Sequence, residues 1–143
     1  MSKHRTVLSV FIASPGGLDI ERAAVADVSS SLNAEVGPLI DVVVEVKRWE
    51  HLIGLAGRAQ EQIDKVLDEC DLFIGLLHRR WGSPTGDGHD SGFHEEYEVA
   101  LRQFREHKKP EIALFFKSVD DDSQSDPGPE LTRVMKFRTN VER

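Results

Sequence analysis

The sequence has few of the features that mark membrane, secreted and disulfide-rich proteins. Cys70 is the one cysteine in 143 residues, which excludes an internal disulfide framework and fits a reducing cytoplasm. No apolar run approaches the roughly 18 residues that cross a bilayer, and the N-terminus has no small-residue cleavage site of a signal peptide. We therefore expect a cytoplasmic domain, with Cys70 as inert core at the end of a helix.

Positive charge is also scarce. The chain has 18 Lys and Arg against 25 Asp and Glu, which gives a net charge of −7. Binding to a nucleic-acid backbone or an anionic membrane surface needs clustered lysines and arginines, so we expect neither partner. The remaining composition, 39% apolar and 30% charged, is that of a single folded domain over residues 1–143. An enzyme, a small-molecule binder and an interaction module all remain open.

The chain does contain a regular alternation of strand and helix patterns. Apolar, β-branched runs predict strands, and segments with apolar residues at helical spacing predict helices between them. This alternation predicts a parallel sheet with helices on both faces and right-handed crossovers. The predicted strands are 6–13, 39–49, 71–77 and 111–117, and the predicted helices are 18–33, 58–69, 93–107 and 130 onward.

We expect an α/β fold with a flavodoxin-like, doubly wound sheet of strand order 2-1-3-4. The first and third strands are then central neighbours. Such sheets usually have five strands, so we expect the N-terminal part of a longer protein that is cut before a fifth strand; a complete four-strand domain is the alternative. The helix from Glu130 is expected to have a partly covered apolar face, and the acidic stretch 119–129 is expected to be flexible.

Two glycine-rich segments follow the first and third predicted strands. Open parallel sheets bind ligands at the carboxyl ends of the strands where the strand order reverses, which here is between these two strands. Ser14-Pro-Gly-Gly17 suits either a helix cap or a ligand contact, in which the amides of Gly16 and Gly17 hold a phosphate or a ribose oxygen. The segment matches neither GxGxxG nor a Walker pattern.

The second glycine-rich segment runs from Arg80 to Gly92. Segments of this length are often binding loops, and a disordered connection is the alternative. Arg80 suits pairing with a phosphate, and Trp81 suits stacking on a base. This segment therefore supplies further candidates for the same site.

Three acidic residues crowd the helix that follows. Helical geometry places Glu96 beside the apolar stripe near the helix N-terminus, and turns Glu95 and Glu98 toward solvent. We expect Glu96 to be half-buried and to face the crevice; a solvated acid that favours the helix N-terminus is the alternative. Glu21 falls within the apolar stripe of the first helix, where we expect it to pair with an arginine.

No metal site is predicted. His94 begins a pattern like HExxH, but position 98 is a glutamate and the zinc-protease reading fails. Asp87, His89 and Asp90 do not have the spacing of metal ligands.

Five strings in combination carry a resemblance to one family. The chain resembles the TIR-like domain of unknown function found at the N-terminus of STAND-type NTPases. That domain is related to TIR domains and, more distantly, to nucleoside 2-deoxyribosyltransferases. The resemblance covers nearly the whole chain and is carried by the strings VFIASPGGLDIER (10–22), VKRWE (46–50), CDLFIGLLHRRWGSPTG (70–86), SGFHEEYEVAL (91–101) and PEIALFFK (110–117).

The resemblance implies a catalytic role for Glu96. In TIR-type NAD hydrolases a glutamate on the helix after the third strand precedes an alanine by four positions, as Glu96 precedes Ala100. The deoxyribosyltransferase pattern Ser-Gly-Thr-x-x-Glu-x-Gly-x-Ala is matched at Ser91, Gly92 and the same two residues. A phenylalanine and a glutamate replace its threonine and its second glycine.

The implied activity is cleavage of NAD(P) or a nucleotide at the ribose anomeric carbon, in a prokaryotic defence or signalling protein. NAD is then a substrate, and no cofactor is expected. Two alternatives remain open: a non-catalytic module that self-associates through fused downstream domains, and a sensor that binds a nucleotide without cleaving it. The implied ligand contacts are Ser14, Gly16, Gly17, Trp49, Arg80, Trp81 and Ser91.

Overall fold

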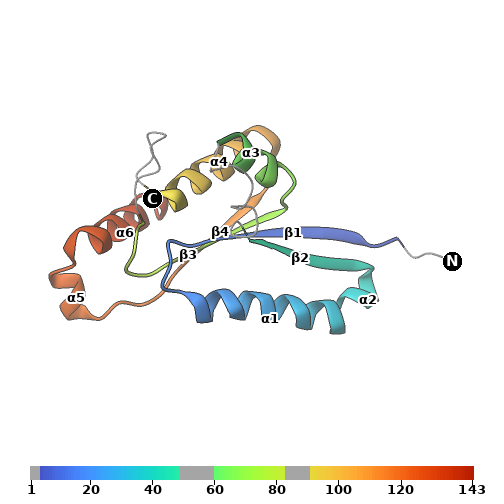
Figure 1. Ribbon diagram of the computed structural model, residues 1–143, viewed down its shortest axis with the longest axis horizontal. Coiled ribbons are helices and arrows are strands. Elements are labelled where there is room, and N and C mark those ends of the chain that lie inside the picture. Colours follow the sequence, from blue (N-terminus) through green and yellow to red (C-terminus); the bar gives the residue numbers. More distant parts are fainter. Residues whose placement is uncertain (1–3, 49–59, 83–90) are drawn as a thin grey trace.

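A computed structural model describes residues 4–48, 60–82 and 91–143. Strands and helices alternate along the chain as the sequence predicts (Figure 1). No helix within these described ranges is both long and apolar enough to span a bilayer. The elements are β1 (Thr6–Ala13), α1 (Asp19–Glu35), α2 (Gly37–Ile40), β2 (Val42–Arg48), α3 (Gln60–Asp68), β3 (Leu72–Leu77), α4 (Gly92–His107), β4 (Glu111–Phe116), α5 (Asp121–Ser125) and α6 (Gly128–Val141).

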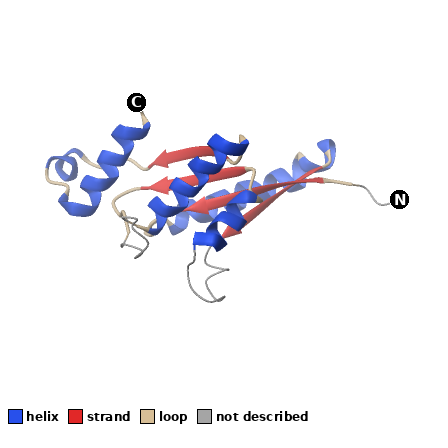
Figure 2. Cartoon of the chain, turned by 90° about the horizontal axis from the view of Figure 1, so that it is seen from above, coloured by secondary structure: helices blue, strands red, loops and turns tan. Residues whose placement is uncertain are grey.

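The four strands form one parallel sheet of order β2-β1-β3-β4 (Figure 2), which confirms the predicted topology. The central strands are β1 and β3, and the second half of β1 is buried. Phe11 and Phe73 are register partners, and their rings stack with centroids 5.8 Å apart. A fifth strand stays a prediction.

Asp71 sets the register of the central strands. Its carboxylate accepts the backbone N–H of Ser9 at 2.8 Å, and its own N–H donates to the carbonyl of Ser9 at 2.8 Å. A slip of one residue would break both bonds and turn every side chain of the strand to the opposite face. These two bonds therefore align the carboxyl ends of β1 and β3.

The two faces of the sheet are covered unequally. Helix α1 lies on one face, and α3, α4 and α6 lie on the other (Figure 1). The larger hydrophobic core is on the side of α4 and α6, where Phe73, Phe93 and Phe137 are buried. On the side of α1, the core is a small cluster of Ile12, Leu18 and Leu76.

The predicted second strand begins three residues too early. Leu39 and Ile40 belong to the helical turn α2, which Pro38 starts and which ends at Asp41 with a left-handed backbone (φ 54°). The residues 39–49 contain no signal for this turn. The only signal is Pro38, which directly precedes them. The strand itself begins at Val42 and is an edge strand, as expected.

The acidic stretch after β4 contains a short helix, α5, that the sequence analysis did not predict. The side chain of Asp120 accepts the N–H of Ser123 at 2.9 Å and so caps α5. Arg79, which follows β3, donates to the same carboxylate at 2.6 Å. The predicted flexibility of the stretch stays a prediction.

The apolar face of helix α6 is more buried than predicted. Leu131, Val134 and Phe137 are all buried, and the ring of Phe137 packs edge-on against Tyr97 and Phe93 of α4. The expected helix from Glu130 is confirmed, whereas the expected partial exposure of its apolar face is wrong for these three residues.

Gly75 should be intolerant of any side chain. A Cβ at this position would lie 2.6 Å from Cδ2 of Leu114 and 3.1 Å from Cε2 of Phe93. We expect Gly75→Ala to lower the free energy of unfolding by about 1–3 kcal/mol, as overpacking does in other cores. The midpoint of urea unfolding measures this loss. In a Leu114→Ala background the same change should cost less, and an equal cost in both backgrounds would contradict the close contact.

Candidate functional site

The carboxyl ends of β1 and β3 lie side by side, because Ala13 is the register partner of Gly75. The turn after β1 needs glycine, since Gly16 (φ 108°) and Gly17 (φ 77°) have backbone conformations that other residues rarely adopt. The loop after β3 comes back to this turn. The two glycine-rich segments of the sequence therefore meet at the point where the strand order reverses.

Two arginines flank the turn after β1. Nη1 of Arg80 lies 3.9 Å from the position that a Cβ on Gly16 would occupy, and its Nε lies 3.7 Å from the equivalent position on Gly17. Nη1 of Arg22 donates to Oγ of Ser14 at 3.1 Å. The structure thus brings Ser14, Gly16, Gly17 and Arg80 together, and none of the described residues forms an ion pair with Arg80.

The N-terminus of α4 lies against the same turn. A Cβ on Gly82 would be 3.2 Å from Cβ of Ser91 and 3.7 Å from Cβ of Pro15. Helix α1 also begins at this edge, directly after the turn, and no side chain caps its first N–H groups. Helix N-termini carry partial positive charge, so both helices favour a negatively charged ligand here.

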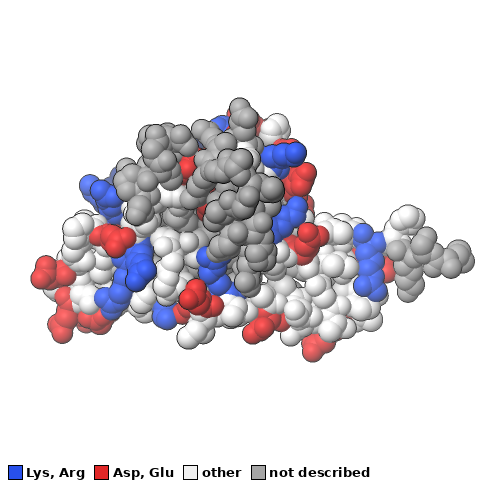
Figure 3. Space-filling model, in the orientation of Figure 1, with Lys and Arg blue, Asp and Glu red and all other residues white. Residues whose placement is uncertain are grey.

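The described residues that Figure 3 shows carry acidic and basic side chains interspersed with each other, and they form no large patch of one sign on that face.

Ser91 has a structural task in addition to its predicted one. It is fully buried, and its hydroxyl accepts the N–H of His94 at 3.1 Å as the N-cap of α4. Its extended backbone is the usual one for this position. The cap orients the first turns of the helix that carries Glu96, and a ligand contact of Ser91 stays a prediction.

The three acids of α4 differ in exposure. Glu98 is exposed, as predicted, whereas Glu96 is only 6% exposed and so is more deeply buried than the predicted half-burial. Oε1 of Glu98 lies 3.1 Å from Nε2 of His94. The prediction for Glu95 is wrong, because this residue is 0% exposed. Glu96 is therefore not the one buried acid of the helix.

Helix α4 has contacts on two sides. Phe93 and Tyr97 pack on α6, whereas Gln103 donates to the carbonyl oxygen of Asp64 in α3 at 2.8 Å. Glu95 lies one turn after the buried Ser91 and one turn before the buried Val99. A helical wheel that has only one apolar stripe does not predict the burial of this part of the helix surface.

Trp81 is a core residue. It is 3% exposed, and its ring packs against Phe93, His94 and Phe137 at centroid distances of 5.9, 5.6 and 5.4 Å. In this conformation the ring has no free face for a base, so we do not assign it to the ligand. The second predicted aromatic, Trp49, and residues 83–90 of the predicted binding loop lie outside the described residues.

Glu130 is a residue of this site that the sequence analysis missed. Its Oε1 accepts the N–H groups of Trp81 and Gly82, at 3.3 and 3.2 Å, and so ties the first turn of α6 to the loop after β3. The acidic residue after the Pro-Gly-Pro stretch was the available signal. The loop that Glu130 binds is at least 48 residues away in the sequence, however, and sequence spacing does not reveal a contact over that distance.

Glu21 pairs with a lysine, and the expected arginine partner is wrong. Nζ of Lys117, just after β4, donates to Oε1 of Glu21 at 2.5 Å. This hydrogen bond lowers the pKa of the Glu21 carboxyl below its ordinary value. Arg22, one residue further on, binds Ser14 instead.

Among the described residues, there is no set of metal ligands, and the one cysteine is buried. Within the described ranges, no three His, Cys, Asp or Glu side chains gather as a set of metal ligands. Cys70 is buried at the end of α3, where its Sγ lies 3.2 Å from the carbonyl oxygen of Val66. Burial raises the pKa of its thiol to about 11.

The chain belongs to the family described as "Domain of unknown function (DUF4062)", which it matches over residues 9–143. Comparison with curated proteins gives no match. Comparison with solved structures also gives none.

The thiol of Cys70 should be inert in the folded protein. A pKa of about 11 leaves on the order of one thiol in a thousand ionised near pH 8, and the thiolate is the reactive form. We expect negligible labelling by an aromatic disulfide reagent in buffer and complete labelling in denaturant. Stoichiometric labelling of the folded chain within minutes would show that the thiol is accessible and ionised.

Proposed function

We propose that this DUF4062 domain binds the phosphates of an NAD-type nucleotide at the turn after β1 and cleaves the N-glycosidic bond with Glu96. The observation that carries the proposal is the position of the Arg80 guanidinium over Gly16 and Gly17, beside the N-terminus of the helix that holds a nearly buried Glu96. Phosphate and carboxylate chemistry are thereby available at one edge of the sheet.

The phosphate-binding half of the proposal rests on complementary charge. A glycine turn allows a phosphate to approach backbone N–H groups closely, and a guanidinium adds charge-assisted hydrogen bonds. Arg80 reaches across the turn, and Arg22 holds the hydroxyl of Ser14 beside it. The uncapped first turn of α1 offers further N–H donors in the same direction.

The catalytic half rests on the place of Glu96 along α4. It follows the N-cap Ser91 by five residues, which corresponds to roughly 7.5 Å along the helix axis. Ser91 itself lies against Gly82 and near Pro15, so the carboxylate is set back from the phosphate-binding turn. That separation suits a ribose between the phosphate and the acid.

The reaction breaks the bond between C1′ of the ribose and the nicotinamide nitrogen. The electron pair leaves with the nicotinamide and neutralises its positive ring, while C1′ takes on oxocarbenium character. A carboxylate beside C1′ stabilises this charge, because it is held in a site with little competing water. Water then adds to C1′ and gives its proton to the carboxylate, which yields ADP-ribose. The resemblance to TIR-type NAD hydrolases supports this role of Glu96.

Binding without cleavage is the second candidate function. Every group that we assign to the phosphates, namely the turn, Arg80 and the first turn of α1, is independent of Glu96. A sensor of ADP-ribose-type nucleotides needs only these groups. The two experiments that follow separate the candidates.

Arg80 should determine affinity for the phosphates. We expect Arg80→Ala to weaken binding of ADP-ribose roughly tenfold or more, since hydrogen bonds to charged groups contribute about 1.5–3 kcal/mol each. Titration calorimetry measures the change. Arg105→Ala is the matched control, because Arg105 is an exposed arginine in the last turn of α4, at the opposite end of that helix from Ser91. Equal affinities of the two variants would count against the phosphate site.

Glu96 should determine turnover. We expect Glu96→Gln to reduce nicotinamide release from NAD on the order of a hundredfold or more, because the amide cannot stabilise positive charge at C1′. Glu98→Gln on the exposed side of the same helix should retain the wild-type rate. The assay is run on the protein in a self-associated form. Equal rates in wild type and Glu96→Gln exclude Glu96 as catalyst, and binding of ADP-ribose without any NAD cleavage indicates the sensor.

A further inference from the structure

Asn33, in the last turn of α1, binds the backbone of β2 with both ends of its carboxamide. Its Nδ2 donates to the carbonyl oxygen of Val44 at 2.8 Å, and its Oδ1 accepts the N–H of Val44 at 2.7 Å. Both distances lie at the short end of the range for N–H···O hydrogen bonds. One side chain thus satisfies both backbone polar groups of one strand residue.

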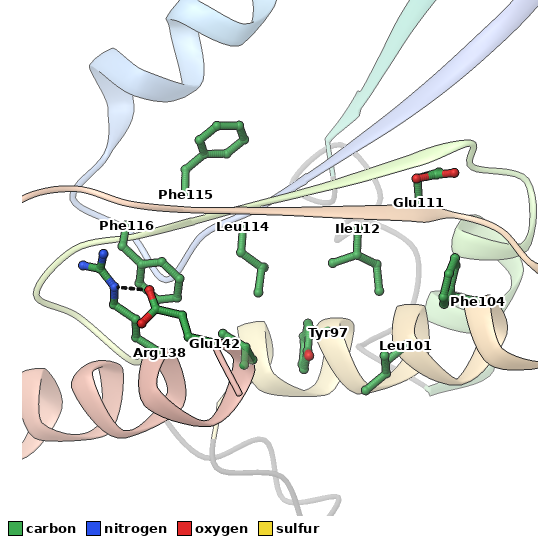
Figure 4. Close-up of a pocket in the computed structure, with 11 residues that line it drawn as sticks. Tyr97, Leu101, Phe104, Glu111, Ile112, Leu114, Phe115, Phe116, Arg138 and Glu142 are labelled. Carbon is green, nitrogen blue, oxygen red and sulfur yellow. Dashed lines mark hydrogen bonds and ion pairs between the residues drawn. The ribbon is translucent and has the colours of Figure 1, made fainter.

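The backbone groups of Val44 face away from the rest of the sheet. Side chains alternate between the two faces of a strand, as Figure 4 shows for Leu114 and Phe115 of β4. The N–H and C=O groups of successive residues alternate in the same way between the two edges of a strand. In the sheet that the structure describes, β2 pairs with β1 alone. Because Asn33 takes both groups of Val44, these groups lie on the outer edge, and so do those of Val42.

The helical turn α2 covers the outward carbonyl of Val42. A Cβ on Gly37 would lie 2.4 Å from this carbonyl oxygen, so a residue with a side chain does not fit here. Gly37 is itself buried in this contact. The backbone of α2 therefore occupies the space that a neighbouring strand would need in order to pair at Val42.

The second half of β2 carries a different protection. Residues 42–44 are three consecutive valines, and they are followed by the exposed Glu45 and by Lys47. Charged side chains, lysine above all, are a usual device against pairing at the edge of a sheet. The half of the strand that has no charge is therefore the half that Asn33 and Gly37 cover.

We propose that the carboxamide of Asn33 takes the place of a neighbouring strand's peptide group, and that it thereby closes the outer edge of β2 to pairing with a second copy of this chain. A carboxamide presents the same donor and acceptor as a peptide group, and its two bonds to Val44 are those that a further strand would make. Without them, three valines would stand beside unpaired N–H and C=O groups, which is the composition of an edge that pairs with other chains.

The closure depends only on residues near β2 in the sequence. Asn33 and Gly37 belong to α1 and α2, which directly precede the strand, and the contact does not involve the other edge of the sheet. It is also independent of the proposed nucleotide site at the carboxyl ends of β1 and β3. A form of this protein that self-associates must therefore do so through a surface other than the edge of β2 at Val44.

The first experiment measures amide hydrogen exchange of the unaltered protein by NMR spectroscopy. The N–H groups of Val43 and Glu45 face β1, and we expect the outward N–H of Val44 to exchange within about tenfold of their rates, because it is bonded as well as they are. An amide on an open edge exchanges with rates near those of an unstructured peptide. Such a rate at Val44 would overturn the proposal, and this measurement needs no variant.

The second experiment compares self-association of the full chain and its variants by analytical ultracentrifugation over a range of concentrations. We expect Asn33→Ala to associate at concentrations roughly tenfold or more below those that the wild type requires, since each pairing backbone hydrogen bond contributes about 0.5–1.5 kcal/mol. Asn140→Ala, at an exposed asparagine of α6, is the matched control and should behave like the wild type. Circular dichroism checks the fold of each variant.

A second variant guards against a failure of Asn33→Ala to fold. Asn33→Asp has almost the same size and retains an acceptor for the N–H of Val44, but it turns an oxygen toward the Val44 carbonyl in place of the donor. We expect it to associate more readily than the wild type as well. Folded Asn33→Ala or Asn33→Asp protein that associates no more than the wild type contradicts the closure.

The third experiment locates the new association. The N–H of Val44 is not used in the pairing with β1, so a proline at this position leaves that pairing intact and removes a donor from the outer edge. Adding Val44→Pro to Asn33→Ala should therefore restore the mass of the wild type. If the double variant associates as strongly as Asn33→Ala alone, the association uses another surface and the proposal is rejected.

Discussion

The parallel pairing of β1 with β3 is the constraint on which the rest of the molecule depends. It brings together two strands 62 residues apart through the Ser9–Asp71 hydrogen bonds and the stacked rings of Phe11 and Phe73. Since both strands leave the sheet at the same edge, the pairing also brings together the turn after Ala13 and the loop after Leu77. The candidate site is a consequence of this pairing and not of any one motif.

A second set of contacts makes that edge rigid from the side of α4 and α6. Trp81 is buried among aromatic side chains from both helices, and Glu130 accepts the N–H groups of the loop that carries Trp81. Burying an aromatic side chain of this size contributes about 1.5–3 kcal/mol, which exceeds what a surface ion pair supplies. The aromatic contacts therefore outweigh the surface pairs as the reason that Arg80, the next residue, stays over the glycine turn.

The opposite face of the sheet has much less cover. Leu18, the N-cap of α1, is buried, whereas Val28 and Leu32 within the helix remain exposed beside the groove. An apolar stripe in a sequence predicts a contact surface, and it does not say whether the partner element belongs to the same chain.

Periodicity and turn chemistry determined the element types, the strand order and the glycine turn, because alternation of apolar runs and the backbone needs of Gly16 and Gly17 are local properties. They also placed Glu96 on a buried side of α4, since helical phase is local too. Contacts between distant segments decided the rest. The core position of Trp81 needs Phe137 of α6, and the pairing of Glu21 needs Lys117. Each depends on which elements the fold places side by side. Spacing along the sequence carries no information on how far apart two elements lie in space.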